Sequence, residues 1–242
     1  MTQIYWMFPE SPPDLESQAG TFLSPREQSI YTTLHFPKRR TDWLLGRWAA
    51  KQLAHALPLY RALSWQAIEI LPNPQGAPSL HISGRPAPNT VLSLSHSYGR
   101  VLCAISQTPG LQLGVDLEKI EARPAVFVED YFTSHERHLI QTALLEQQPF
   151  FITLFWSLKE AMLKALGIGL RQDTRRVEVI QIQQEGGNWK RATVQSDALP
   201  SNRWTAFWQQ RGEFILSLVT SLPEEHALPL SQLDLQTLFP VT

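Results

Sequence analysis

Cysteine is almost absent from this chain of 242 residues, which contains only Cys103. A single cysteine excludes an intrachain disulfide framework and a zinc site built from several thiolates. Cys103 stands in the apolar run VLCAI, and we expect it to be buried, because a free cysteine packs as a small hydrophobe. The chain is long enough to bury a large core without such cross-links.

An excess of charge of either sign is also missing. The chain has 21 Lys and Arg against 22 Asp and Glu, which gives a formal net charge of −1. A domain that binds nucleic acid is usually strongly basic, so we expect no nucleic-acid partner, although a local phosphate site is compatible with this balance.

Long apolar runs are missing as well. The run FFITLFW is far shorter than the ~20 apolar residues that a membrane span needs, and the N-terminus lacks a basic start. We therefore expect a cytoplasmic, soluble protein with no membrane partner.

The first half of the chain alternates between strand-like and helix-like segments. We expect a strand at QIYWMFP, a helix with Ser24 as its N-cap, and a second helix from about Thr41 to Ala56. Residues 71–89 are dense in Pro and Gly and predict a loop. Strands are expected near 90–95 and over 100–106.

The second half repeats this order. We expect a strand at LGVDLEKI, a helix that begins at Thr133, and a strong helix over FITLFWSLKEAMLKAL that ends at Gly167. Antiparallel strands are expected in RVEVIQIQQ, KRATVQS, RWTAFWQQ and GEFILSLVTS. The predicted fold class is α+β.

An internal repeat connects the two halves. FLSPREQSI resembles YFTSHERHLI about 109 positions later, and WLLGRWAAKQL resembles WSLKEAMLKAL about 113 positions later. The second alignment gives the pairs Trp43–Trp156, Arg47–Glu160 and Lys51–Lys164. Two amphipathic helices that merely share a period are the alternative to the duplicated α+β unit that we favour.

The repeat predicts a pseudo-dimer of two similar halves with a site in the cleft between them. We expect an N-terminal half over 1–108, a C-terminal half over 109–222, and a tail over 223–242 that packs on the body. Clefts of this kind commonly bind ligands. One half can then present cations where the other presents acids.

Two short motifs contain candidate catalytic or metal-binding residues. In LGVDLEKI, Asp116 and Glu118 point to one face of the strand, and carboxylates at this density suit Mg²⁺. In FWSLKEAMLKALG, Glu160 and Lys164 lie one helical turn apart. Taken alone, the first pair is typical of a solvated strand edge, and the second of a surface ion pair worth ~0.2–0.5 kcal/mol.

A histidine and a basic cluster are candidates for binding phosphate. His96, in LSLSHSYGR, is a possible donor at the end of a strand, or else a turn histidine satisfied locally. No G-x-S-x-G segment accompanies it, which argues against a serine hydrolase. The basic residues are Lys38, Arg39, Arg40, Arg47 and Lys51; such a run forms either a solvated face or a phosphate site.

In this order and spacing, the motifs resemble the phosphopantetheinyl transferases of the broad-specificity, surfactin-synthetase-activating type. That family has a segment of roughly the pattern (I/V)-G-(I/V)-D-x-E followed by (F/W)-(S/C/T)-x-K-E-(A/S)-x-x-K. The matching residues are Gly114, Val115, Asp116, Glu118, Trp156, Ser157, Lys159, Glu160, Ala161 and Lys164. The resemblance extends over about residues 20–220 and includes GAP at 76–78 and SHS at 95–97.

The resemblance implies a pseudo-dimer of two α+β halves and a transfer reaction. Members move the 4′-phosphopantetheine arm of coenzyme A to a serine of an apo acyl or peptidyl carrier protein and release adenosine 3′,5′-bisphosphate. By position, Asp116, Glu118 and Glu160 would bind Mg²⁺, or Mn²⁺, while His96 and Lys164 would contact the diphosphate. The serine proton would be taken by Glu160 itself or through a metal-bound water.

The same resemblance implies further contacts to coenzyme A, the co-substrate. Those expected near its phosphates are Ser95, His96, Lys159, Lys164 and the basic residues Lys38, Arg39, Arg40 and Arg47. The segment LLGR aligns well and favours Arg47. Glu136 matches a family acid with a supporting role, and Ser93 replaces an asparagine that many relatives have.

The implied partner is a carrier protein, which is generally acidic and would favour basic and apolar patches beside the site. We expect it to contact residues 122–149, with Phe127, Tyr131 and Phe132 near that surface. A monomer is expected, since each half supplies a partner for the other. The alternatives are a coenzyme A diphosphate hydrolase and a non-catalytic protein that binds coenzyme A or a carrier.

Overall fold

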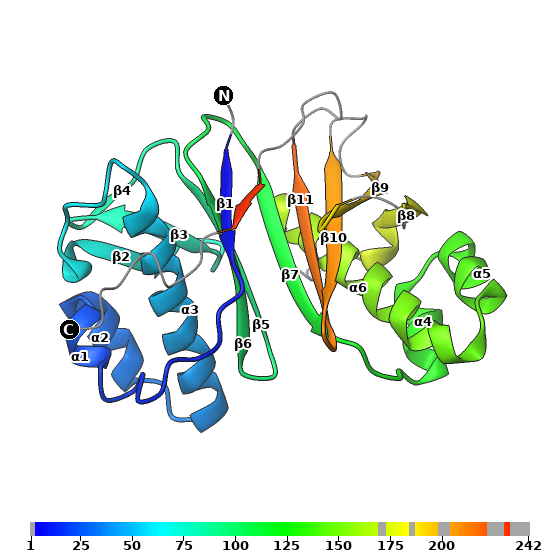
Figure 1. Ribbon diagram of the computed structural model, residues 1–242, viewed down its shortest axis with the longest axis horizontal. Helices are drawn as coiled ribbons and strands as arrows, with labels where there is room; N and C mark the ends of the chain where they lie inside the picture. The colour runs from blue at the N-terminus through cyan, green and yellow to red at the C-terminus, as the bar shows by residue number, and fades with distance from the viewer. Residues whose placement is uncertain (1–2, 169–172, 184–186, 198–203, 222–229, 233–242) are drawn as a thin grey trace. The chain divides into compact units, whose positions relative to one another are not determined.

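The computed structural model describes residues 3–168, 173–183, 187–197, 204–221 and 230–232 (Figure 1). The chain divides into two compact units, Met1–Leu111 with Leu228–Thr242, and Gln112–Ala227. Each unit has its own hydrophobic core and combines helices with β-sheet. The predicted α+β fold class is confirmed.

The first unit places one long helix against a mixed sheet. Its helices are α1 (Ala19–Phe22), α2 (Pro25–Thr32), α3 (Pro37–Ala56) and the 3₁₀ turn η1 (Trp65–Ala67). Its strands are β1 (Ile4–Met7), β2 (Ile68–Pro72), β3 (Pro78–Ile82), β4 (Arg85–Pro86), β5 (Val91–Ser97), β6 (Arg100–Ser106) and β12 (Leu230–Gln232). Strands β12-β1-β6-β5 form one sheet and β2-β3-β4 another. Helix α3 packs on β6, β5 and β1.

The helices of this unit begin where the sequence indicates. Ser24 caps α2, and Glu27 completes a capping box with it. Helix α3 begins at Pro37, a few residues before the predicted start, because proline is well tolerated in the first turn of a helix. Leu44, Leu45 and Leu53 of α3 are buried in the core.

The loop predicted over 71–89 is wrong, because β3 and β4 lie within it. Pro72, Pro78 and Pro86 stand at the ends of their strands, where the missing N–H costs little. Gly76 has a φ of +87° and allows the turn between β2 and β3. The prolines and glycines therefore bound short strands instead of excluding them.

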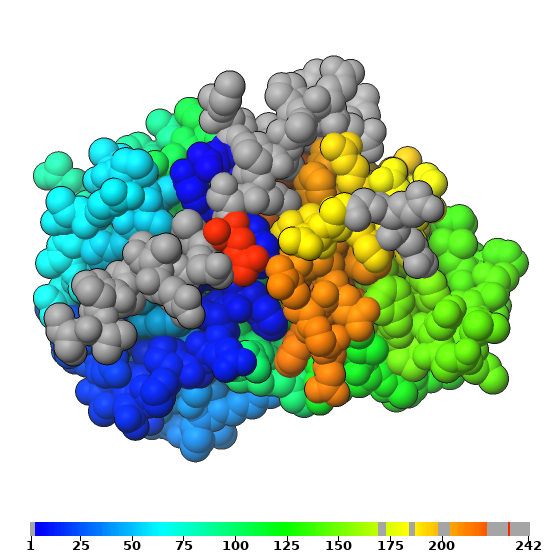
Figure 2. Space-filling model, in the orientation of Figure 1, coloured from blue at the N-terminus to red at the C-terminus, as the bar shows by residue number. Residues whose placement is uncertain are grey.

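The second unit is built around one antiparallel sheet. Its strands are β7 (Leu113–Lys119), β8 (Val177–Ile182), β9 (Lys190–Ser196), β10 (Thr205–Arg211) and β11 (Phe214–Thr220), in the order β7-β11-β10-β9-β8. Its helices are α4 (Ala125–Tyr131), α5 (Ser134–Thr142), α6 (Gln148–Ala165) and the 3₁₀ turns η2 (Leu145–Gln147) and η4 (Thr174–Arg176). Helix α6 packs on β7 and β11 and lies behind the strands in Figure 1; atoms of β10 and β11 (orange) are visible in Figure 2.

Two helix ends in this unit, the start of α5 and the end of α6, also lie where the sequence predicts them. Thr133 and Glu136 form a capping box at the start of α5, as Ser24 and Glu27 do at α2. Beyond α6, Gly167 has a φ of +71°, and the N–H of Ile168 donates to the carbonyl of Leu163 at 3.2 Å. The predicted stop at Gly167 is confirmed.

The two units repeat one arrangement, and the strands fix its register. Met7 on β1 lies opposite Cys103, the fourth residue of β6. Asp116 on β7 lies opposite Ser217, the fourth residue of β11. Met7 and Asp116 are therefore equivalent positions, which agrees with the repeat of about 109 positions seen in the sequence.

The alignment of the long helices needs a correction. Lys51 of α3 pairs with Glu27, and Lys159 of α6 pairs with Glu136, each at 2.6 Å. Because Glu27 and Glu136 are equivalent capping residues, Lys51 corresponds to Lys159 and not to Lys164. The predicted pairing over the two helices is wrong by five positions, since one helix can match another at more than one spacing.

Other predictions fall outside what the structure describes. Most of the tail 223–242 lies outside the described residues; within it, β12 pairs in parallel with β1. The boundaries at 108 and 222 and the cleft between the halves stay predictions. In the described part of the chain, no helix is both long enough and apolar enough to span a membrane.

Candidate active site

Strand β7 presents a face of acidic residues to helix α6. Gly114, Asp116 and Glu118 alternate along the strand and so point to the same side. A Cβ on Gly114 would lie 1.9 Å from the carbonyl oxygen of Ala161, so only glycine allows the two backbones to approach so closely. This contact brings Glu160, the residue before Ala161, to the acidic face of the strand.

Two cations neutralise the acids of this face. Lys164 Nζ lies 2.7 Å from Asp116 Oδ1, and Asp116 is buried. Arg123, in the loop after β7, lies 3.2 Å from Glu118 Oε2 and 3.2 Å from Glu121 Oε1. The sequence analysis did not single out Arg123, although its place five residues after Glu118 was a signal that could have found it.

Glu118 and Glu160 are held in an environment that opposes their ionisation. Burial raises the pKa of Glu160 to about 7, and the negative charge of Asp116 adds to the effect. Burial and Asp116 likewise raise the pKa of Glu118 to about 7, against the opposing effect of Arg123. Asp116 therefore lies close enough to both Glu118 and Glu160 for its charge to oppose their ionisation, as expected for a site that takes up positive charge.

The chemistry of these donors fits a hard divalent cation. Glu160 Oε1 is buried and accepts no hydrogen bond from the residues that the structure describes. An oxygen-only set of carboxylates is what Mg²⁺ prefers in proteins. Among the described residues, no three His, Cys, Asp or Glu side chains are already arranged as metal ligands, so these acids would have to turn toward an ion.

The first unit contains a cavity of about 550 Å³ beside helix α3. It is lined by Phe36, Lys38, Arg39, Asp42, Trp43, Arg47 and His96. Four of the residues predicted near the phosphates share this cavity: Lys38, Arg39, Arg47 and His96. Phe36, Asp42 and Trp43 were not predicted to line it, because nothing in their spacing separates them from ordinary helix positions.

Arg47 is a buried cation of this cavity. Its guanidinium lies over the ring of Trp43 at 4.1 Å, and burial lowers its pKa to about 10. No carboxylate of the described residues lies within ion-pair distance of it, and its Nε has no hydrogen-bond partner among them. A buried guanidinium without a carboxylate partner favours an anionic ligand.

His96 is packed tightly against α3. A Cβ on Gly46 would lie 2.5 Å from His96 Nε2, so the glycine leaves the room that the imidazole occupies. Ser95, the neighbour of His96 on β5, points to the opposite face of the strand. The structure therefore places His96 in the cavity and gives no support to a role for Ser95 there.

Two other predicted ligands lie away from these clusters. Lys159 was expected near the phosphates of coenzyme A, but its side chain is fully buried and bound to Glu136, which corrects that expectation. Arg40 pairs with Glu16 at 2.9 Å and lies over the ring of Tyr31 at 3.9 Å, and it does not line the cavity. Glu136 bonds Lys159 in the core and completes the capping box of α5, and its supporting role in the site stays a prediction.

The surface predicted for a carrier protein is only partly accessible. Tyr131 is exposed and Phe127 half-buried, but Phe132 is fully buried, so its place at that surface was wrong. The ring of Phe127 packs against Tyr131, Phe132 and Trp156. A second cavity of about 560 Å³ lies in this region; its lining includes Arg123, Val128, Arg137 and His138.

Known proteins share these features of the sequence. Residues 112–219 match the 4′-phosphopantetheinyl transferase superfamily. The chain is 30% identical over 172 residues to 4′-phosphopantetheinyl transferase HetI of Nostoc sp., a match that covers 68% of each protein. It is 29% identical over 132 residues to 4′-phosphopantetheinyl transferase psf-1 of Bacillus pumilus, covering 54% of this chain and 52% of that protein. The solved holo-(acyl-carrier-protein) synthase of Thermotoga maritima is 26% identical over 47% of this chain and 64% of that chain, with a TM-score of 0.37.

Proposed function

The chain belongs to the 4′-phosphopantetheinyl transferase superfamily, and from that premise we propose that it transfers the 4′-phosphopantetheine arm of coenzyme A to a serine of an apo carrier protein. The observation that supports this most directly is the group formed by Asp116, Glu118, Glu160 and Lys164 where β7 meets α6. These are the residues that the family motif requires at those positions.

The reaction needs charge neutralisation and a proton acceptor. The serine hydroxyl attacks the β-phosphate of the coenzyme A diphosphate, the bond from that phosphorus to the bridging oxygen breaks, and adenosine 3′,5′-bisphosphate leaves. Transfer of this kind depends mainly on positioning and on electrostatic stabilisation. Asp116, Glu118 and Glu160 would hold Mg²⁺, which when bound neutralises the charge of the diphosphate.

The protein's own side chains supply the remaining chemistry. Lys164 is a cationic donor beside the acids, where negative charge grows on the leaving group. Glu160 is the carboxylate proposed to accept the serine proton; its pKa of about 7 belongs to the site without metal and would fall when a cation binds.

The cavity beside α3 would bind the nucleotide end of coenzyme A. Arg47 supplies a buried fork of donors for a phosphate, and Lys38 and Arg39 add positive charge at the cavity wall. His96 supplies a further nitrogen in the same cavity. The cavity has the size of a typical ligand site.

Finer features of the protein are proposed on the sequence resemblance. They are the surfactin-synthetase-activating subtype with its broad carrier range, a monomeric state, a cytoplasmic location, and Mg²⁺ or Mn²⁺ as the metal. The cavity near Arg123 and Arg137, together with exposed Tyr131, supports contact with an acidic carrier over residues 122–149.

Intact mass spectrometry of an apo carrier protein tests the proposed function. The carrier is incubated with the protein, coenzyme A and Mg²⁺, with EDTA, or with the variants Glu160→Gln and Glu213→Gln. Glu213 is an exposed acid on the turn before β11 and serves as the matched control. We expect no gain of mass in EDTA, gain of one phosphopantetheine about a hundredfold more slowly with Glu160→Gln, and gain at the wild-type rate with Glu213→Gln.

Two other results would contradict the proposal. Coenzyme A that is cleaved while the mass of the carrier stays the same would identify a diphosphate hydrolase. Coenzyme A that stays intact with several unrelated carriers would identify a protein that binds and does not transfer.

A further inference from the structure

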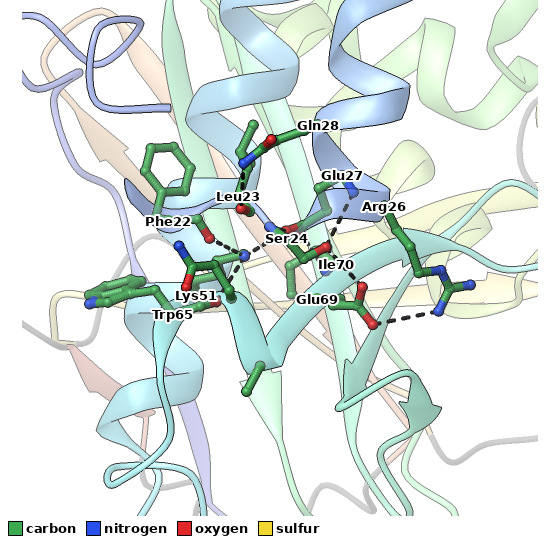
Figure 3. A network of polar contacts seen from close by, with 12 residues as sticks. Phe22, Leu23, Ser24, Arg26, Glu27, Gln28, Lys51, Trp65, Glu69 and Ile70 are labelled. Atoms are coloured by element: carbon green, nitrogen blue, oxygen red, sulfur yellow. Dashed lines mark hydrogen bonds and ion pairs between the residues drawn. The ribbon is translucent and has the colours of Figure 1, made fainter. Parts of the chain in front are cut away.

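Both units contain a buried glutamate that joins three elements of the fold. We call Ser24, Glu27, Lys51, Glu69 and Ile70 the Glu27 network (Figure 3). The equivalent Glu136 network consists of Thr133, Glu136, Lys159, Glu178 and Val179. In each, the glutamate side chain is fully buried and bound to a fully buried lysine.

The Glu27 network satisfies its charged groups completely. Glu27 Oε2 accepts from the backbone N–H of Ser24 at 2.9 Å and from Lys51 Nζ at 2.6 Å, while Oε1 accepts from the backbone N–H of Ile70 at 2.8 Å. Lys51 Nζ also donates to the carbonyls of Phe22 and Trp65. Hydrogen bonds to Glu27 thereby join the start of α2, the C-terminal half of α3 and strand β2 (Figure 3).

Arg47 lies between two fixed points of α3. It precedes Lys51 by four residues, so the two side chains share one face of the helix. Gly46, beside it, touches His96 of β5. The contact of Gly46 with His96 and the ion pair of Lys51 with Glu27 therefore fix how α3 is rotated about its axis and where it lies along the sheet.

Glu27 also acts on Arg47 through its charge. Its carboxylate opposes the lowering of the pKa of Arg47 by burial, while Arg47 in turn lowers the pKa of Lys51. The three charges therefore interact, although only Lys51 bonds to Glu27 directly.

We propose that the Glu27–Lys51 pair is a positioning device for Arg47, holding its guanidinium in the cavity for the nucleotide phosphates of coenzyme A. This inference rests on the proposed function, and it adds two residues that do not line the cavity. Glu27 and Lys51 are positioning residues, since they act on the ligand only through Arg47.

The second unit offers a matched control. Lys159 is equivalent to Lys51, and the residue four before it is Phe155, which is buried and uncharged. Removal of the Glu136–Lys159 pair therefore perturbs an equally buried ion pair without an arginine to displace.

The test is the affinity for adenosine 3′,5′-bisphosphate, measured by isothermal titration calorimetry in EDTA at fixed salt. The variants are Arg47→Gln, the double variant Glu27→Gln/Lys51→Met, the same double in the Arg47→Gln background, and the control Glu136→Gln/Lys159→Met. Each double variant removes both charges, so neither leaves a buried ion unpaired. Circular dichroism and thermal unfolding establish that each variant is folded.

We expect the Glu27→Gln/Lys51→Met change to raise Kd about 3- to 30-fold, and the control to leave it unchanged within about twofold. In the Arg47→Gln background the same change should have no further effect, because the pair acts through Arg47. If the ion pairs served stability alone, both double variants would unfold at a lower temperature. Kd for adenosine 3′,5′-bisphosphate would then change by the same factor in both. Should the double variant not fold, Glu27→Gln alone keeps the shape of the side chain, and its Kd should rise in the same direction.

Four results would overturn the inference. An unchanged Kd in Glu27→Gln/Lys51→Met, or an equal change in the control, shows that the pair does not position Arg47. An undiminished effect in the Arg47→Gln background shows that it acts elsewhere. If Arg47→Gln itself leaves Kd unchanged, the cavity is not the nucleotide site, and that part of the proposed function fails together with this inference.

Discussion

The two units contain the same buried ion pair and differ in the charges that surround it. Lys51 with Glu27 and Lys159 with Glu136 are each 2.6 Å apart, and in each unit the other oxygen of the glutamate accepts a backbone N–H of the next strand at 2.8 Å. We call this buried pair with its backbone hydrogen bond the frame, and both copies of the repeat contain it.

Around that frame the equivalent positions have diverged. Asp116 of the second unit corresponds to Met7, and by the register of the lysines Glu160 corresponds to Gln52 and Lys164 to Ala56. In the opposite direction, Arg47 of the first unit corresponds to Phe155. The acids of the candidate site therefore lie in one copy and the buried arginine in the other, and under the proposed function each copy would serve a different part of coenzyme A.

The largest expected effect tests whether the frame is equivalent in the two copies. Lys51→Met and Lys159→Met each leave a buried carboxylate without its cation, which should lower the free energy of unfolding by about 3–5 kcal/mol in either unit. Urea denaturation measures this, and a second substitution of the glutamate by glutamine should restore most of the loss. If the free energy of unfolding fell by less than about 1 kcal/mol for one of the two variants only, the ion pairs would not be equivalent in the two units.

A smaller effect on stability is expected to distinguish the glycine that contacts α6, Gly114, from the glycine that contacts His96, Gly46. Gly114→Ala places a Cβ against the backbone of α6, which has to move, and should destabilise the protein by about 1–3 kcal/mol and weaken Mg²⁺ binding. Gly46→Ala meets the end of the His96 side chain, which can rotate away, so stability should fall less while the KM for coenzyme A rises. Denaturation, metal titration and initial rates measure the three quantities; equal destabilisation by both variants would contradict this distinction.

The smallest effect concerns pH and is specific to the acidic copy. Glu118 and Glu160 have pKa values of about 7 instead of 4.5, so their protonated forms favour the folded state without metal. That contribution is complete below pH 4.5 and is lost as the pH rises through 7. Mg²⁺ should therefore raise the melting temperature by a few degrees at pH 8 and hardly at all at pH 5.

Thermal unfolding with Mg²⁺ or EDTA at the two pH values measures this dependence. Glu160→Gln should reduce the gain at pH 8, whereas Glu213→Gln should not. The same Mg²⁺ effect at pH 5 and pH 8 would contradict the assignment of these acids as the metal ligands.

Much of the site could be predicted because its signals are local. Asp116 and Glu118 share a face by strand alternation, and Glu160 and Lys164 share one by helical spacing. Ser24 and Thr133 mark the starts of their helices through capping boxes. Each of these follows from residues within one turn or one strand.

What the sequence analysis missed depends on contacts between distant residues. Lys159 is the neighbour of Glu160 in the motif, yet Glu136, which lies 23 positions earlier, holds it in the core. The residue equivalent to Lys51 in the repeat was missed for the same reason. The sequences of the two helices can be aligned at 108 or at 113 positions, and only the matching ion pairs show that 108 is correct. Strands β3 and β4 were missed because prolines at strand ends look the same in a sequence as prolines in a loop.

The division of tasks between the two copies is tested most directly by initial rates of carrier loading against the concentration of coenzyme A. Arg47→Gln should raise KM about tenfold with kcat within about threefold of wild type, because it removes a binding contact. Glu160→Gln should lower kcat about a hundredfold with KM within about threefold, because it removes the proposed metal ligand and proton acceptor. Variants that change the same kinetic parameter to the same extent would contradict the account.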